Sequence, residues 1–524
     1  MRRLARAASW CLLASCAPQT SGAPASGEPV VSASAAPAPP PSESAPSSAS
    51  SVADPAPAPP APFWRERLQA PAGTRVYAKT RYVWVHYEPS AASGWRGFLW
   101  LGGYADVARG PIVGQGGCAA WYEVKPRGYV CVDGDKATLD PADPQLLALL
   151  PYAPDVSSPW PHRYGESRGA QRYRELPTPE QQRGREWDLP EHRARMQRAA
   201  EGDVHASLVG VDLSPGSTTP LSLPALPATL REERKRLLPQ STVAWSREWS
   251  DGERSWLLSG DFVWVPKDRV APYPVSRFHG VTLGGEVRLP LAFFKQKARP
   301  RYKVVGDAFE PDGAPFERHA WVMLTGEARA AGGKRYLETR EPGVWVQEAD
   351  ATVARAREVS PWGAKIGEPD ATGKAPRGRQ TWLDASILSG WMVAYEGTTP
   401  VYATLISPGR GGLPERGKDP IETASTPAGA YAITGKFATA TMVAPGEFIH
   451  SDVPYAQNFH GPHAIHVAYW HDDWGDKKSA GCVNVSAIDG KWLFDWTEPR
   501  IPPGWHGVRL EPDKDPATLF YLHE

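Results

Sequence analysis

Short segments rich in aromatic and β-branched residues, separated by Gly and Pro, recur along most of the chain. They include residues 82–86, 98–101, 262–266 and 320–324. Segments of this length and composition form β-strands, and the Gly and Pro between them form turns. With 22 Trp, 55 Pro and 49 Gly among its 524 residues, the sequence predicts a mainly β protein of several domains.

Composition divides the chain into seven segments, which are 1–16, 17–62, 63–151, 152–240, 241–380, 381–512 and a C-terminal tail at 513–524. Segment 17–62 is mostly Ala, Pro and Ser, buries too little apolar surface to fold, and is predicted to be a disordered tether. The segments 63–151 and 241–380 resemble SH3-like β modules. The alternative is an elaborated β domain with no binding role. Charged stretches with Pro near their starts, at 179–200 and 226–238, predict a few helices in the connector between the modules.

The N-terminus has the pattern of an export signal. Three arginines among the first six residues precede a short apolar stretch. Residues 13–16, Leu-Ala-Ser-Cys, resemble a lipobox, so 1–16 is expected to be a lipoprotein signal peptide and Cys16 the lipidated residue. An ordinary signal peptide cleaved further along is the alternative. Because Pro18 rather than Asp follows Cys16 at the second position, resemblance to Gram-negative lipoproteins implies a periplasmic, lipid-anchored protein at the outer membrane.

The charge balance limits the class of partner. Lys+Arg and Asp+Glu each total 58, so the formal net charge is zero. Nucleic-acid binding needs a basic surface, and no nucleic-acid partner is therefore expected. No run of about eighteen apolar residues follows the N-terminus, so no internal membrane span is expected.

The five cysteines fall into separate classes. Cys11 lies inside the signal, and Cys16 is the predicted lipid attachment site. Cys118 and Cys131 flank two strand-like segments, and in an oxidising compartment we expect a disulfide between them across a hairpin. Two buried free thiols are the alternative. Cys482 then remains as a single unpaired cysteine in an exported protein.

Two short runs near the C-terminus contain the candidate chemistry. Residues 464–470 read Ala-Ile-His-Val-Ala-Tyr-Trp, and residues 479–485 read Ser-Ala-Gly-Cys-Val-Asn-Val. His466 and Cys482 are sixteen residues apart, and a hairpin-like return would bring the thiol beside the imidazole. A neighbouring base supplies thiolate at neutral pH. The amides of Gly481 and Cys482 are candidates to receive a developing oxyanion.

This block resembles the catalytic domain of the L,D-transpeptidases (the YkuD family). In that family a His precedes Ser/Thr-His-Gly-Cys, a hydrophobic residue, and Arg or Asn. The residues that match this signature are Ser479, Gly481, Cys482, Val483 and Asn484. Upstream, residues 426–429 resemble the family's Thr-Pro-x-Gly turn, and residues 452–455 and 459–461 resemble its lead-in to the catalytic His. The resemblance covers 381–512 and implies a β-sandwich catalytic domain.

The resemblance implies a reaction and its main residues. Cys482 would be the nucleophile, His466 the general base, and the backbone carbonyl of Val467 would orient the imidazole. The substrates would be peptidoglycan stem peptides, joined by 3→3 cross-links. Carbapenems would be covalent inhibitors, and neither a metal nor an organic cofactor is expected. Ala480 departs from the family, which has His there, and Val467 replaces the usual Gly or Ser.

Three further residues, Trp470, Asn484 and Ser479, are predicted to contact the substrate. For Trp470 the alternative is a position in the core, and for Asn484 it is a role in holding the active-site loop. Zinc binding is a second interpretation of the His- and Asp-rich stretch 460–473. It is disfavoured because His463 and His466, three apart in a strand-like run, are expected on opposite faces. The polar residues expected at the surface or in a solvated loop are Lys436, His450, His471 and Asp472.

Two other functions fit the same sequence. With water as the acceptor the site would be an L,D-carboxypeptidase, and with a cross-link as the donor an endopeptidase. A non-catalytic wall-binding lipoprotein, in which the β modules bind glycan, is the second alternative.

Overall fold

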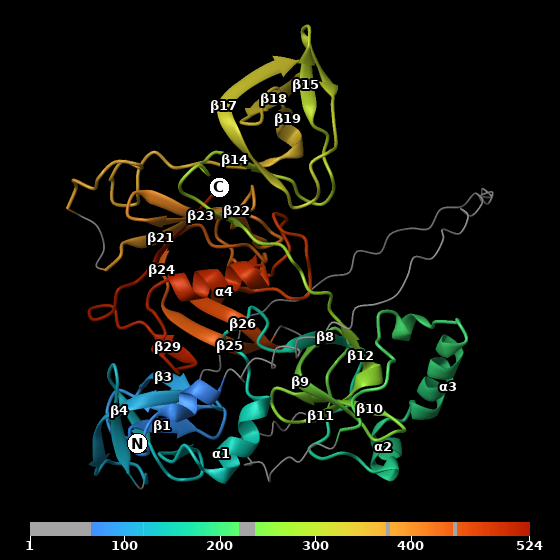
Figure 1. Cartoon of the computed structure of the whole chain (residues 1–524), viewed down its shortest axis with the longest axis vertical. Helices are drawn as coiled ribbons and strands as arrows, with labels where there is room; N and C mark the ends of the chain where they lie inside the picture. Colours follow the sequence, from blue (N-terminus) through green and yellow to red (C-terminus); the bar gives the residue numbers. More distant parts are fainter. Residues whose placement is uncertain (1–63, 119, 220–235, 374–377, 444–447) are drawn as a thin grey trace, which may run out of the picture.

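The computed structural model describes residues 64–524 apart from 119, 220–235, 374–377 and 444–447 (Figure 1). The predicted signal with Cys16, the tether 17–62 and most of the predicted helix 226–238 lie outside the described residues. The part of the chain that is described contains four sheets, and the predicted mainly β, multidomain fold is confirmed. Its α-helices, none of which has the length and apolar character of a membrane-crossing helix, are α1 (Pro144–Leu149), α2 (Pro179–Arg185), α3 (Leu189–Ala200) and α4 (Ala487–Trp496).

One twelve-stranded sheet runs through both the first β module and the C-terminal block. Its strands, in sheet order, are β28 (Val483–Val485), β27 (His463–Val467), β26 (Ile449–His460), β25 (Gly435–Val443), β29 (Gly507–Arg509), β3 (Trp95–Leu99), β2 (Val83–His86), β6 (Tyr129–Cys131), β5 (Trp121–Val124), β4 (Tyr104–Ile112), β1 (Arg75–Ala78) and β7 (Ala137–Thr138). The two parts meet where β29 pairs with β3, with Val508 opposite Gly97. A Cβ on Gly97 would lie 2.4 Å from the carbonyl oxygen of Gly507, so this close pairing requires glycine.

The predicted disulfide between Cys118 and Cys131 is present in the first module. Cys131 ends β6, and Trp121, at the start of β5, is its partner across the antiparallel pair. The bridge therefore ties the chain that enters β5 to the neighbouring strand.

Two further sheets lie between the first module and the C-terminal block. The second module is a five-stranded antiparallel sheet of β11 (Trp264–Pro266), β10 (Ser255–Ser259), β9 (Thr242–Ser250), β8 (Arg163–Ser167) and β12 (Val270–Pro272). The third is a seven-stranded sheet of β16 (Ala308–Pro311), β15 (Tyr302–Val305), β19 (Trp345–Gln347), β18 (Lys334–Thr339), β17 (Trp321–Ala331), β14 (Leu291–Phe293) and β20 (Thr352–Ala354). The predicted segment 241–380 thus holds parts of two modules. The predicted connector 152–240 was wrong in part, because β8 lies within it and pairs with both β9 and β12.

The fourth sheet belongs to the C-terminal block. Its strands are β13 (Val281–Thr282), β23 (Thr399–Leu405), β22 (Trp391–Glu396), β21 (Thr381–Ser386), β30 (Leu519–His523) and β24 (Gly429–Ala432). The prediction of a tail at 513–524 was wrong, because β30 lies inside this sheet, parallel to β21 and antiparallel to β24. Alternate residues of β30, Phe520 and Leu522, are fully buried in the core.

Helix α4 lies between this sheet and the strands β25 and β26 (Figure 1). Its N-cap is Ser486, whose hydroxyl accepts a hydrogen bond from the amide of Asp489. Leu493 of α4 packs with Ile465 of β27 and Val483 of β28 in one hydrophobic cluster. The helix therefore packs against β27 and β28, the two strands that carry the candidate catalytic runs.

Lys436 of β25 closes the C-terminal end of α4. Its ammonium donates to the carbonyl oxygens of Phe494 (2.5 Å) and Thr497 (2.8 Å). The side chain is fully buried, which corrects the expected surface position of Lys436. The helix end supplies carbonyl groups that lack partners within the helix, and they offset part of the cost of burying the ammonium.

The buried position makes stability depend on pH. Burial lowers the pKa of Lys436 to about 7, against 10.5 for the exposed side chain. Between these values the unfolded chain binds more protons at this residue than the folded chain, so the free energy of unfolding should rise with pH. We expect urea titrations of wild type and Lys436→Met at pH 7 to 10 to show a stability difference that moves in favour of wild type as pH increases. Parallel pH profiles for the two proteins would contradict this.

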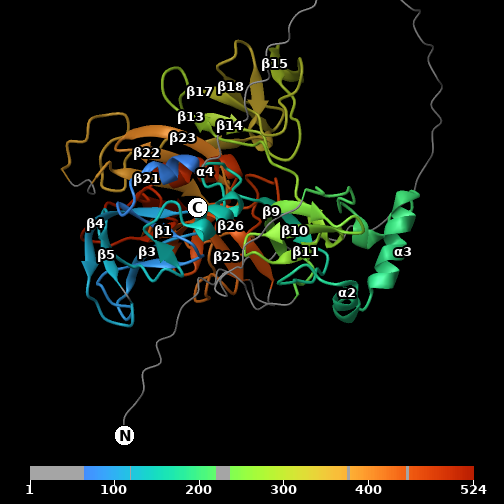
Figure 2. The same ribbon diagram turned by 60° about the horizontal axis from the view of Figure 1, so that its bottom comes forward.

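The second and third modules both pack against the C-terminal block (Figures 1 and 2). In the second module, Thr242 of β9 forms two hydrogen bonds with Ser451 of β26, both at 2.9 Å. The Ser451 amide donates to Thr242 Oγ1, and the Ser451 hydroxyl donates to the Thr242 carbonyl oxygen. In the third, Lys295 donates to the carbonyl of Gly475 at 2.9 Å. The upstream modules therefore contact β26 and the loop that follows β27.

Candidate active site

The strands that carry the two candidate runs lie side by side, but in parallel. β27 pairs with β28 with His466 opposite Asn484 and Val467 opposite Val485. The predicted hairpin-like return was therefore wrong, because a parallel pair needs a crossover, which residues 468–482 supply. The register nevertheless places Cys482 two residues before the position paired with His466.

His466 is held by hydrogen bonds at both ring nitrogens. Nδ1 donates to the carbonyl oxygen of Val467 at 3.0 Å, the contact expected from the family resemblance. Nε2 accepts from the Asn484 amide at 3.1 Å. This pattern places a ring proton on Nδ1 and the lone pair on Nε2. The same lone pair is the one available to a thiol proton, so the Asn484 amide competes with the thiol for it.

A second histidine extends this chain of hydrogen bonds. His471 Nε2 donates to Asn484 Oδ1 at 3.4 Å, and its Nδ1 accepts from the amide of Asp473 at 3.3 Å. Burial lowers the pKa of His471 to about 4, so it is neutral at pH 7. His471 was expected in a solvated loop; it does lie in a loop but is half-buried there. Asn484 links the two imidazoles and holds the active-site loop, which was one of its two predicted roles.

The turn before Cys482 is supported by hydroxyl groups. Ser479 Oγ donates to the carbonyl of Cys482 at 2.5 Å and accepts from the amide of Gly481 at 3.0 Å. Thr426, from the Thr-Pro-x-Gly segment, donates to the carbonyl of Gly481 at 3.0 Å. Ser479 is buried and serves the turn, rather than the predicted substrate contact. The Gly481 amide, predicted to receive an oxyanion, is likewise engaged by Ser479.

The imidazole next to Gly481 comes from His463. A Cβ built on Gly481 would lie 2.8 Å from His463 Nε2, and the opposite ring nitrogen bonds the carbonyl of His460 at 3.1 Å. The family places its second histidine at position 480, where this chain has Ala. Sequence reasoning missed this role for His463, although its position three residues before His466 was noted.

Trp470 lies between two histidine rings. Its ring centroid is 4.5 Å from that of His450, stacked at 24°, and 5.8 Å from that of His466. His450 is fully buried, which corrects its expected surface position. Trp470 is half-buried and packs against the hydrophobic cluster that includes Cys482. Its position therefore fits both predicted roles, a residue of the core and a residue that contacts the substrate.

Cys482 itself forms no disulfide and is buried, with 3 % of its surface exposed. Val467 and Tyr469 belong to the same hydrophobic cluster. A ligand therefore reaches the sulfur only after neighbouring groups move. The crossover between β27 and β28 contacts the third module, and these contacts resist such movement.

The crossover loop is held by polar contacts around Asp472. Its carboxylate accepts from Ser276 Oγ at 2.5 Å and from Trp474 Nε1 at 2.7 Å. Arg318 of the third module pairs with it at 3.1 Å, and both side chains of this pair are about one-third exposed, at 36 % and 37 %. Solvent screening limits such a pair to a modest contribution.

Loosening this pair should make the thiol more accessible. We expect Arg318→Gln to raise the rate at which 5,5′-dithiobis(2-nitrobenzoate) labels Cys482 by about two- to fivefold, the effect of losing one partly exposed ion pair. Arg335→Gln is the matched control, since Arg335 is an exposed residue of the same module that pairs with Glu348 instead. Equal labelling rates for all three proteins would show that the pair does not restrain the loop.

One family model and several solved structures resemble part of this chain. The family model described as the YkuD L,D-transpeptidase catalytic domain matches residues 380–504. A solved cysteine-to-serine mutant of Enterococcus faecium L,D-transpeptidase is 19% identical, covers 27% of this chain and 49% of its own, and has a TM-score of 0.20. The E. faecium catalytic domain acylated by ertapenem is 21% identical, covers 25% of this chain and 95% of its own, and has a TM-score of 0.19. An L,D-transpeptidase from Mycobacterium smegmatis is 14% identical, covers 47% of this chain and 100% of its own, and has a TM-score of 0.21.

The chain spans about half the length of the E. faecium mutant, at 49%. A search of the curated proteins finds no match. The matched family region contains His466, Gly481, Cys482 and Asn484 and lies in the C-terminal block described above. Residues 380–504 are therefore a catalytic domain of the YkuD family of L,D-transpeptidases.

Proposed function

We propose that the chain is a peptidoglycan L,D-transpeptidase that forms 3→3 cross-links through a thioester on Cys482. The observation that carries this proposal is the orientation of His466. Its Nδ1–H is fixed on the Val467 carbonyl, and its Nε2 lone pair accepts from the Asn484 amide. His466 lies on the strand paired with the strand that follows Cys482. A thiol with such a base nearby is an activated nucleophile.

The proposed reaction has two balanced halves. The thiol proton passes to His466 Nε2, and the sulfur attacks the carbonyl carbon at the L-centre of the third stem residue. The bond to D-Ala breaks, and the leaving amine takes the proton from His466. The side-chain amine of a second stem then attacks the thioester, its proton passes to His466, and the Cys482 sulfur leaves as thiolate. No redox step and no cofactor is required.

Burial of the sulfur favours an amine acceptor over water. The thiol lies in an apolar cluster with 3 % exposure, and a closed site limits hydrolysis of a reactive intermediate. This supports transfer over the carboxypeptidase alternative. We also propose that lipid on Cys16 anchors the protein at the periplasmic face of the outer membrane, and that 17–62 lets the enzyme reach the wall.

Purified protein incubated with tetrapeptide stems and analysed by mass spectrometry tests the proposal. We expect cross-linked dimers together with free D-Ala, and tripeptide as a minor product. Tripeptide without dimers would indicate an L,D-carboxypeptidase. A carbapenem is a second probe, since the E. faecium catalytic domain has been solved acylated by ertapenem. A wild-type protein that gives neither dimers nor a carbapenem adduct would support the non-catalytic alternative.

A further inference from the structure

A large groove lies between the second module and the residues that precede it. Its volume is about 710 Å³, within the range of small-molecule sites. Its aromatic walls include Trp160 and Tyr273, both half-buried, and the buried rings of Tyr164 and Trp245. None of the residues of the catalytic site described above lines it.

The aromatic wall continues into the catalytic domain. The rings of Tyr164 and Tyr469 stack with centroids 4.0 Å apart, and the Tyr273 ring lies 5.9 Å from that of Tyr469. Trp160 is 6.2 Å from Tyr164 on the other side. Tyr469 follows His466 by three residues and belongs to the hydrophobic cluster of Cys482. Stacked rings therefore connect the groove to the hydrophobic cluster of the catalytic domain.

The charged side chains at this groove balance. Three are positive and three negative: Arg163, Arg247 and Lys267, and Asp155, Asp212 and Glu248. Lys267 does not line the groove but pairs with Asp212, which does. Glu248 pairs with Arg163 at 2.9 Å and with Lys267 at 3.0 Å. Burial lowers the pKa of His162, which also lines the groove, so it adds no charge at neutral pH. A stem peptide carries several carboxylates and would need an excess of positive charge. An uncharged ligand with apolar and hydroxyl faces fits the balance better.

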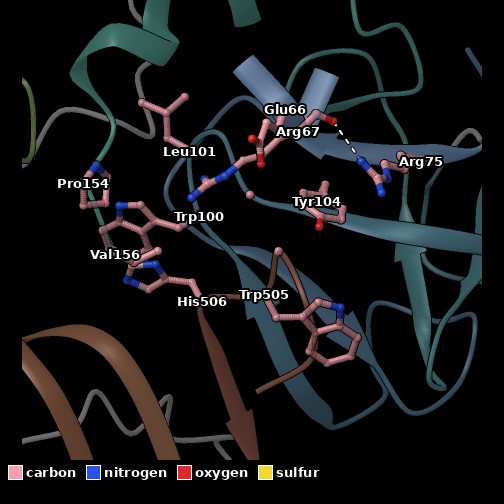
Figure 3. Close-up of a pocket in the computed structure, with 12 residues that line it drawn as sticks. Glu66, Arg67, Arg75, Trp100, Leu101, Tyr104, Pro154, Val156, Trp505 and His506 are labelled. Atoms are coloured by element: carbon pink, nitrogen blue, oxygen red, sulfur yellow. Dashed lines mark hydrogen bonds between the residues drawn. The ribbon is translucent and has the colours of Figure 1, made fainter. Parts of the chain in front are cut away.

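A second cavity, shown in Figure 3, lacks this character. It is lined by Trp100, Tyr104 and Arg67 among others. The Trp100 ring stacks on His506 with centroids 4.7 Å apart, and the Arg75 guanidinium covers the Tyr104 ring at 4.1 Å. Its aromatic faces are thus already used by protein groups, whereas Trp160 and Tyr273 each leave part of a ring open to their groove.

We propose that the Trp160–Tyr273 groove binds the uncharged glycan of the peptidoglycan substrate, a chain of N-acetylated hexosamines. Apolar sugar faces pack on the two rings, and the paired carboxylates and guanidinium groups bond the hydroxyls. Because the groove adjoins the catalytic cluster through Tyr469, a bound glycan would place its attached stem peptide near Cys482. This inference rests on the proposed function and adds a subsite to it.

Binding of chitotetraose, an uncharged tetramer of N-acetylglucosamine, tests the groove directly. The full chain with Cys482→Ala is titrated by calorimetry, so that no turnover interferes. We expect saturable binding that Trp160→Ala weakens about tenfold, the effect of losing one aromatic packing contact. Val275→Arg, at an exposed position in the groove wall, blocks access without altering the core and should weaken binding as well. Trp187→Ala is the matched control, since Trp187 is 83 % exposed and is not among the residues that line the groove.

Kinetics separate this proposal from the proposed reaction. With wild-type Cys482, Trp160→Ala should raise KM for disaccharide-linked tetrapeptide by a larger factor than KM for free tetrapeptide. If neither peptide reacts but chitotetraose still binds, the proposed transpeptidase activity is contradicted and the proposed glycan site is supported. Absence of saturable binding, or binding that neither Trp160→Ala nor Val275→Arg affects, would overturn the glycan site.

Discussion

Replacing Cys482 with alanine is expected to abolish both cross-linked dimers and the carbapenem adduct, because no other residue of the site can form the thioester. His466→Gln keeps a hydrogen-bonding side chain of similar reach but no basic nitrogen. We expect it to lower kcat/KM for cross-linking by about 10² to 10⁴, the usual contribution of a general base. Stopped assays with tetrapeptide stems and intact-protein mass spectrometry give the two readouts.

The control for this pair is His460→Gln. His460 is exposed at the end of β26, in the same sheet, and touches the site only at its edge, through its carbonyl and its ring against His463. Its activity should stay within about twofold of wild type, as expected of a surface substitution. A Cys482→Ala protein that still forms an adduct would place the nucleophile elsewhere. A fully active His466→Gln would mean that another group takes the thiol proton.

Much of the candidate site could be predicted from local sequence. The strand with His466, the turn at Gly481 and the following strand were found from residue pattern, and the Val467 carbonyl contact from the family resemblance. Each of these features depends on residues within one short run. The parallel pairing of β27 and β28 could not be found in this way, because a short apolar run fits a parallel or an antiparallel neighbour equally.

The parts that sequence reasoning missed depend on distant segments. Lys436 looks like a surface residue until the carbonyls of Phe494 and Thr497, about sixty positions away, form its site, at separations of 58 and 61 residues. The segment of β30 looks like a tail in the sequence. Its interior place in the sheet follows only from pairing with β21, far earlier in the chain. The burial of Cys482 likewise depends on how the crossover packs. Local pattern does not encode such contacts.

Gly481→Ala is the second substitution with a large expected effect. Gly481 has a φ of +128°, which L side chains rarely adopt. An added Cβ would lie 2.8 Å from His463 Nε2 and 2.9 Å from the carbonyl oxygen of Ser425. The imidazole can move a little, but the Ser425 carbonyl is backbone and cannot yield without moving its segment. The turn that carries Cys482 must therefore shift, and we expect cross-linking to fall about 100-fold, as for a displaced catalytic group.

A matched control separates the effect of the close contacts at Gly481 from the stability lost by placing alanine at any positive φ. Gly461, in the hairpin between β26 and β27, also has a positive φ, +52°, but an added Cβ there meets nothing within 4 Å. Gly461→Ala should lose about 1 kcal/mol of stability from the backbone alone and retain most of its activity. Thermal melts and the rate of carbapenem acylation are measured for both variants. If Gly481→Ala acylates as fast as Gly461→Ala, the contacts of Gly481 with His463 and Ser425 do not set the position of the sulfur.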